Sequence, residues 1–260
     1  MIKEISIIDK IKLGKSIKNE LIIDCHAHYG IWYEIYSAYW SEEKFIDYLS
    51  LIGIDYICTS HFLGIGPDFR TGNDEILKLM KKYPNLVIGE AVINPNYPSE
   101  IKIELERCLN NGFKIFKLHP EKHQYKADGK NYEPVYEFCN DNNLIILNHD
   151  FGSPDFLEKI SKKYKNTVYI IGHGNSAGYE EVLRKHKNVY ISLVASYEFG
   201  EIERLVREVG SDKLLFGTDI PYLDAGFQLG SLIYADISDI DKRKILGKNF
   251  FEILSDKKII

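Results

Sequence analysis

Apolar residues in this chain fall into eight short runs, and most segments between the runs repeat apolar positions with the period of a helix. After Ser41, a suitable N-cap residue, positions 45, 46, 49 and 52 are apolar on one helix face up to Gly53. Alternation of strands and helices is typical of a parallel sheet. The eight runs predicted as strands are residues 21–27, 54–59, 86–93, 113–118, 144–147, 167–171, 189–194 and 213–217.

Eight strand–helix units in 260 residues match the (β/α)8 barrel in number and in size. We therefore predict an α/β fold, a (β/α)8 TIM barrel with a single domain. A doubly wound open sheet is the structural alternative, but no Gly-x-Gly-x-x-Gly pattern follows the first run. We expect the barrel to occupy residues 21–260 and residues 1–20 to form an N-terminal leader that covers its bottom.

The composition narrows the classes of partner. Lys and Arg number 33 against 38 Asp and Glu, so the net charge of −5 disfavours nucleic acid. No apolar stretch is long enough to span a membrane, and the first residues lack the apolar core of a signal peptide. The four cysteines are widely spaced, which favours a reducing cytoplasmic location. We expect a small-molecule substrate, no nucleic acid and no membrane, and leave a homodimer open.

Candidate chemistry begins where the first strand ends. His26 and His28 are two residues apart, and because side chains alternate along a strand, both imidazoles point to the same face. Cys25 is then expected to face away from them. His149, His173 and Asp219 follow the fifth, sixth and eighth runs. Because the carboxyl ends of barrel strands meet at one rim, these side chains predict a site for a divalent cation with an open position.

These residues resemble the amidohydrolase superfamily, whose signature is His-x-His after strand one, His after strands five and six, and Asp after strand eight. Longer stretches are similar to the amidohydrolase-related branch, which contains aminocarboxymuconate-semialdehyde decarboxylase and aromatic-acid decarboxylases. The similar stretches are residues 93–95, 112–120, 134–136 and 216–221.

The resemblance implies one divalent metal held by His26, His28, His149 and Asp219, with water in the open position. Zinc is the expected metal, and manganese and iron are alternatives. Asp219 and His173 are the expected catalytic residues, because Asp219 could take and return a proton and His173 could stabilise developing charge.

The substrate-binding candidates are Lys117, His119, His61 and Tyr222. Lys117 follows the fourth strand, where binuclear relatives carry a carboxylated lysine that bridges two metals. The one-metal branch also has Lys-Leu-His-Pro here, so we expect Lys117 to be unmodified and to contact a substrate anion or serve the structure. His119 has the same strand parity as Lys117, His61 follows the second strand, and Tyr222 follows Asp219 closely.

These features predict a metal-dependent hydrolase that activates water against a C–O or C–N bond of a small lactone or amide. The alternative is a metal-dependent decarboxylase of a small aromatic or unsaturated carboxylic acid. A lesser alternative is a TatD-like metal-dependent deoxyribonuclease, since Glu90 invites that comparison. In those enzymes, however, the bridging glutamate follows strand four, whereas Glu90 lies in strand three. A barrel that binds without turnover is the last alternative.

Overall fold

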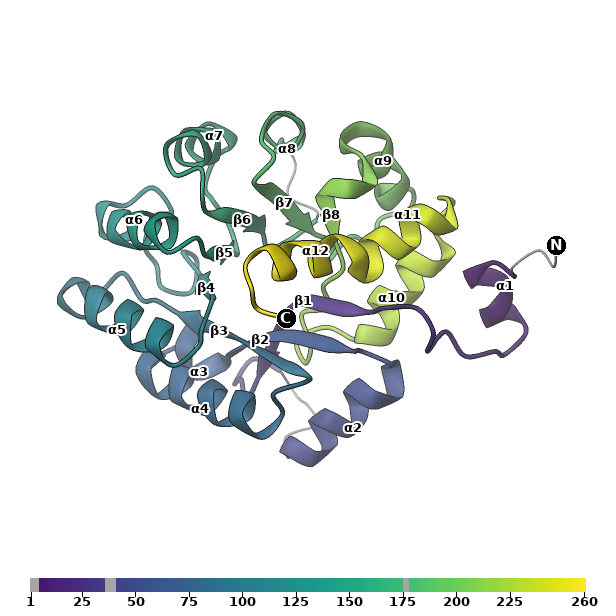
Figure 1. Ribbon diagram of the computed structural model, residues 1–260, viewed down its shortest axis with the longest axis horizontal. Coiled ribbons are helices and arrows are strands. Elements are labelled where there is room, and N and C mark those ends of the chain that lie inside the picture. The colour runs from purple at the N-terminus through teal and green to yellow at the C-terminus, as the bar shows by residue number, and fades with distance from the viewer. Residues whose placement is uncertain (1–4, 36–40, 175–177) are drawn as a thin grey trace.

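Eight parallel strands form one barrel, in which each strand pairs with the next along the chain (Figure 1). The computed structural model describes residues 5–35, 41–174 and 178–260. Every strand overlaps a predicted run, so the single-domain (β/α)8 barrel is confirmed. The strands are β1 (Ile23–Tyr29), β2 (Tyr56–His61), β3 (Val87–Val92), β4 (Ile115–Leu118), β5 (Ile145–Asn148), β6 (Val168–Ile171), β7 (Val189–Ser192) and β8 (Leu214–Leu215).

The barrel closes between the last strand and the first. The backbone N–H of Cys25 donates to the Phe216 carbonyl at 2.9 Å, and the N–H of Asp219 donates to the His26 carbonyl at 2.8 Å. Closure removes the exposed sheet edges and brings the chain after β8 against the end of β1.

Helices surround the barrel (Figure 1). Ser41, Ser153 and Ser238 accept N-terminal backbone hydrogen bonds in α2, α7 and α11. None of the helices within residues 5–35, 41–174 and 178–260 combines the length and apolarity needed to cross a membrane. The helices are α1 (Ile7–Lys12), α2 (Glu42–Ile52), α3 (Phe62–Ile65), α4 (Phe69–Lys82), α5 (Pro98–Asn110), α6 (Glu133–Asp141), α7 (Pro154–Lys163), α8 (Glu180–Lys185), α9 (Glu201–Val209), α10 (Ala225–Tyr234), α11 (Asp239–Arg243) and α12 (Asn249–Asp256), with 3-10 turns at Lys130–Tyr132 and Ser211–Lys213 and a π-helical turn at Lys244–Lys248.

The C-terminal helix packs on the apolar interior of the barrel. Phe250, Ile253 and Leu254 of α12 join the cluster formed by alternate strand residues such as Ile23 and Ile115. The described part of the N-terminal segment lies to one side, where α1 packs beside α10 and the Ile7 N–H donates to Asp239 (Figure 1). Residues 1–4 of the expected leader lie outside the described residues. We expected residues 1–20 to cover the bottom of the barrel. In the described chain α12 packs there instead.

The first strand departs from strict alternation. Its pairing with β2 shifts between Asp24 and Ala27, where two residues of β1 oppose one of β2. Cys25 packs in the barrel interior together with Ile23, two residues before it, although alternation counted from the histidines predicted that it would face away from them. Because of this irregularity in the pairing, the imidazoles of His26 and His28 both lie at one site on the same interior side.

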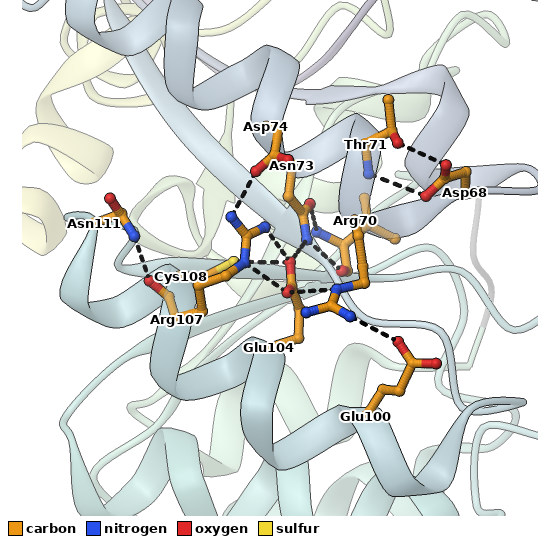
Figure 2. A network of polar contacts seen from close by, with 11 residues as sticks. Asp68, Arg70, Thr71, Asn73, Asp74, Glu100, Glu104, Arg107, Cys108 and Asn111 are labelled. Carbon is orange, nitrogen blue, oxygen red and sulfur yellow. Dashed lines mark hydrogen bonds and ion pairs between the residues drawn. The ribbon is translucent and has the colours of Figure 1, made fainter.

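A polar network stabilises the C-terminal end of β3 (Figure 2). At this end β3 no longer pairs with β2, because their pairing stops at Gly89. Asn73 of α4 accepts from the Val92 N–H at 2.7 Å, and its amide donates to the Val92 carbonyl at 3.0 Å and to Glu104 of α5 at 2.8 Å. Arg107 forms a two-pronged ion pair with Glu104, at 2.7 and 2.8 Å. The network ties α4 and α5 to the rim that carries the site.

Candidate metal centre and active-site pocket

Three of the four predicted metal ligands converge. Ligand atoms of His26, His28 and Asp219 lie within 4.8 Å of one another, and all three residues are buried. Asp219 Oδ1 is 3.0 Å from His28 Nε2 and 3.6 Å from His26 Nε2. Two imidazole nitrogens and a carboxylate oxygen are ligands that zinc, manganese and iron all accept. The donor set thus fits a divalent metal.

Hydrogen bonds orient both imidazoles. His26 Nδ1 donates to the Gly172 carbonyl at 2.8 Å, since a carbonyl can only accept, and this leaves the Nε2 lone pair facing the site. His28 Nδ1 lies 3.0 Å from the Ser60 hydroxyl. Burial lowers the pKa of both imidazoles and so favours the neutral form that binds metals. At Gly172 a Cβ atom would lie 3.0 Å from the Asn148 carbonyl oxygen, so glycine permits the close approach.

Asp24, which the sequence analysis did not select, joins the two strand ends that carry the ligands. Its carboxylate accepts from the His26 N–H at 3.0 Å and from the Thr218 N–H at 3.1 Å. Burial raises the pKa of Asp24 to about 7, although these hydrogen bonds oppose the rise. The sequence did contain a signal for Asp24. It is an aspartate within the apolar run 21–25, and a buried carboxylate needs hydrogen-bond partners.

His149, the fourth predicted ligand, lies next to this group without belonging to it. Its Nε2 is 3.3 Å from Glu121 Oε2, its ring stacks on His119 at 4.0 Å, and the His173 ring is 4.3 Å away. Metal binding by His149 therefore stays a prediction. Glu121 was not predicted, and its only signal was its position directly after Lys-Leu-His-Pro.

The other candidates separate into two sets. His119, His173 and Tyr222 line the pocket beside the ligand group. Lys117 is buried and is not one of the lining residues; its Nζ lies 2.6 Å from His26 Nε2. His61 does not line the pocket either, because its Nδ1 accepts from the Leu63 N–H and caps α3. The expectation of direct substrate contact therefore stands for His119 and Tyr222, while Lys117 and His61 contact other parts of the protein.

The pocket is a cavity of about 220 Å³ with one apolar wall. Trp32 and Phe62 stack with ring centroids 5.4 Å apart, and Phe62 stacks on His28 at 5.0 Å. A larger open hollow of about 510 Å³ adjoins it and shares Glu121, but it contains none of the ligand group. The lining residues of the smaller pocket are His28, Trp32, Phe62, Ile65, His119, Glu121, Lys122, His149, His173, Asp219 and Tyr222.

A (β/α)8 barrel with a His-His-Asp group at the carboxyl ends of its strands is typical of the metal-dependent enzymes of the amidohydrolase superfamily. The sequence matches the amidohydrolase family model over residues 23–249, so this chain belongs to the amidohydrolase family, in the amidohydrolase-related branch that its motifs predict. None of the curated proteins compared with the chain matches it.

Solved structures show the same fold at low identity. A 2,6-dihydroxybenzoate decarboxylase in complex with 2,6-dihydroxybenzoate has a TM-score of 0.75 and 14% identity, covering 91% of this chain and 99% of that one. For 5-carboxyvanillate decarboxylase from Sphingomonas paucimobilis the TM-score is 0.73 and the identity 13%, covering 90% and 99%. A dihydroxybenzoic acid decarboxylase from a Polaromonas species, with bound manganese and 2-nitroresorcinol, has a TM-score of 0.73 and 14% identity, covering 91% and 97%.

Proposed function

We propose that this protein is a metal-dependent decarboxylase of a small aromatic or unsaturated carboxylic acid. The observation that carries the proposal is the stacked wall of Trp32 and Phe62, which faces the same small cavity as His28, His173 and Asp219. A flat ring can lie along such a wall with its polar substituents toward the histidines. The aromatic acids named for the similar structures support this choice over the hydrolase that the sequence analysis favoured.

His26, His28 and Asp219 would hold the metal, with His149 as the proposed fourth ligand. A bound divalent cation would supply Lewis-acid polarisation of the substrate oxygens. Similar decarboxylase structures contain manganese, so manganese and zinc are the metals to test first.

The protein residues then divide the remaining work. Lys122 lines the pocket and would attract the substrate carboxylate, although its Nζ also lies 2.9 Å from Glu34 Oε2. His173 Nε2 has no hydrogen-bond partner within the described residues, so it is free to contact a substrate hydroxyl. Asp219 would take a proton from that hydroxyl and return it to the ring carbon. The bond from this carbon to the carboxylate would then break and release CO₂.

Hydrolysis of a lactone or amide is the second candidate, and one observation favours it. Among the lining residues that the structure describes, Lys122 is the one lysine or arginine, and it is already paired with Glu34. A neutral substrate would not require a cation there, whereas a carboxylate gains from one.

One assay tests both candidates. Protein loaded with manganese or zinc is incubated with hydroxybenzoates, unsaturated acids, lactones and amides, while CO₂ and acid release are followed separately. We expect CO₂ from an aromatic acid and a roughly 100-fold or greater loss of activity in the Asp219→Asn variant. Acid release without CO₂ would establish the hydrolase instead, and metal-loaded protein inert to the whole panel would contradict the proposal.

A further inference from the structure

Lys117 contacts the nitrogen atom that a metal would use. Its side chain is fully buried, and Nζ lies 2.6 Å from His26 Nε2. Because His26 Nδ1 carries the hydrogen that it donates to the Gly172 carbonyl, Nε2 offers the one lone pair of this ring. That lone pair cannot accept from an ammonium group and bind a metal at the same time. Metal binding through His26 therefore requires Lys117 to move.

A carboxylate without a partner lies in the neighbouring strand. Glu90 of β3 is fully buried, and neither of its carboxylate oxygens has a hydrogen bond of normal geometry among the residues that the structure describes, although the nearby Ser60 hydroxyl helps to lower its pKa. Buried carboxylates without partners are rare, because burial costs the charged form its hydration. Glu90 thus has unused capacity to accept hydrogen bonds.

Strand register brings these two side chains near each other. In the β3–β4 pairing Glu90 is opposite Ile115, and Val92 is opposite Lys117, so Glu90 and Lys117 are diagonal neighbours. Ile88, two residues before Glu90, and Ile115, two before Lys117, both pack in the barrel interior, so alternation directs both charged side chains inward. Burial raises the pKa of Glu90, and the charge of Lys117 is the largest influence that opposes this rise.

We propose that Lys117 exchanges partners when the metal binds, leaving His26 Nε2 and pairing with Glu90. Glu90 is then a positioning residue that receives the displaced ammonium group, and Lys117 is neither a metal bridge nor a substrate ligand. This inference rests on the proposed metal centre. The exchange neutralises a buried cation that would otherwise be repelled by the dication beside it.

Carboxylation of Lys117 is the competing arrangement. A carbamate on Lys117 would place a second negative group beside Glu90, and it would need two cations to hold it. The structure groups the ligand atoms of a single His-His-Asp set within the described chain, which supports one metal. The exchange of Lys117 from His26 to Glu90, in contrast, needs no modified lysine and no second cation.

Metal affinity tests the exchange through a double-mutant cycle. Manganese and zinc affinities are measured by competition with a chelating dye for the wild type, Glu90→Gln, Lys117→Met and the double variant. We expect Glu90→Gln to weaken binding roughly tenfold or more when Lys117 is present, because the displaced ammonium has no carboxylate to receive it. In the Lys117→Met background, the same change should alter affinity by less than about twofold. Thermal unfolding of each metal-free variant checks that it is folded.

A direct attraction between Glu90 and the metal would weaken binding equally in both backgrounds, and this result would overturn the exchange. A crystal structure of the metal-loaded wild type gives a second readout. We expect Lys117 Nζ within about 3.2 Å of a Glu90 oxygen. Lysine still on His26, or a planar adduct on Nζ, would overturn the exchange. Wild-type protein that binds no metal would overturn both the metal centre and the exchange, whereas normal binding with an unaffected Glu90→Gln variant would overturn the exchange alone.

Discussion

The Thr218 hydroxyl donates to Asp24 Oδ2 at 2.5 Å and thereby links β1 to the segment that follows β8, two parts of the chain that are adjacent only because the barrel closes. Thr218 directly precedes the ligand Asp219, and Asp24 also accepts from the backbone of His26. A change in the geometry of this pair is therefore transmitted to two of the proposed metal ligands at once.

Replacing Thr218 with valine keeps the side-chain shape and removes that hydrogen bond, together with the one that the hydroxyl accepts from the Ile220 N–H at 3.2 Å. We expect the free energy of unfolding to fall by about 1–2 kcal/mol, because a buried carboxylate oxygen loses its donor. Metal affinity should fall roughly tenfold, since the ligands lose part of their support. Urea unfolding and metal titration measure the two effects. The matched control is Thr59→Val, because the buried Thr59 hydroxyl has no partner within the described chain; equal losses in both variants would contradict this role.

Asp219→Asn separates metal binding from proton transfer. The amide keeps one coordinating oxygen and the side-chain shape but cannot take a proton. We expect metal to be retained and turnover of an identified substrate to fall roughly 100-fold or more. Metal content and steady-state rates are compared with Asp128→Asn, an exposed position in the adjoining hollow, which should leave turnover unchanged. Near-normal rates in Asp219→Asn would move the proton-transfer role to His173.

Metal removal should lower thermal stability. A ligand that binds only the folded state at 100 times its Kd stabilises it by about 2.7 kcal/mol, which corresponds to roughly 5–10 °C in Tm for a chain of this size. We expect added manganese or zinc to raise the Tm of chelator-treated protein by about this amount and EDTA to reverse it. His28→Ala should abolish the shift, and His186→Ala, distant from the site, should retain it. An unchanged Tm in the wild type with saturating metal would count against a folded-state metal site.

The Glu104–Arg107 pair in Figure 2 predicts a pH effect on stability. Burial alone would raise the pKa of Glu104, but hydrogen bonds from Arg107 and Asn73 outweigh it and hold the pKa below its usual value of 4.5. The carboxylate therefore contributes stability above about pH 4.5, and this contribution is lost as the pH falls through the lowered pKa.

Glu104→Gln should therefore destabilise the protein by roughly 2–3 kcal/mol at pH 7, because Arg107 loses the buried one of its two charged partners and keeps only the exposed Asp74. The difference from the wild type should shrink below pH 4.5. Urea unfolding between pH 3 and pH 7 measures both. Glu100→Gln, which removes a more exposed contact to Arg70, is the control and should cost less than about 1 kcal/mol. A difference that does not depend on pH would contradict the assignment.

Much of the fold could be predicted because the strands are short, apolar and separated by helices in a regular order. The predictions that were wrong concern details that depend on tertiary contacts. Ser99 is a suitable N-cap residue in the sequence, but α5 begins at Pro98, whose missing N–H is tolerated in the first turn. Cys25 shares the interior side with His26 and His28 because of an irregularity in pairing with β2, and strand alternation within one sequence cannot reveal a pairing partner.

The same limit applies to the site. His26, His28 and Asp219 were predictable because each ends a strand, and a barrel brings strand ends together. Glu121 and Trp32 were not, because loops place them and no periodic pattern describes a loop. His61 follows β2 as predicted, yet it caps α3 locally, so position at a strand end does not by itself determine where a ring points.

Asp219 has a positive φ of 59°, a left-handed backbone conformation that asparagine, aspartate and glycine tolerate better than other residues. Position 219 therefore places two independent demands on its residue. The residue must tolerate the left-handed backbone conformation, and it must offer a negatively charged metal ligand. Glutamate would keep the charge but strain the backbone, and asparagine or glycine would relax the backbone but lose the charge. Few substitutions satisfy both demands, so random mutagenesis followed by selection for turnover should recover almost only aspartate at this codon, whereas selection for metal binding should also admit asparagine and selection for folding alone should admit asparagine and glycine.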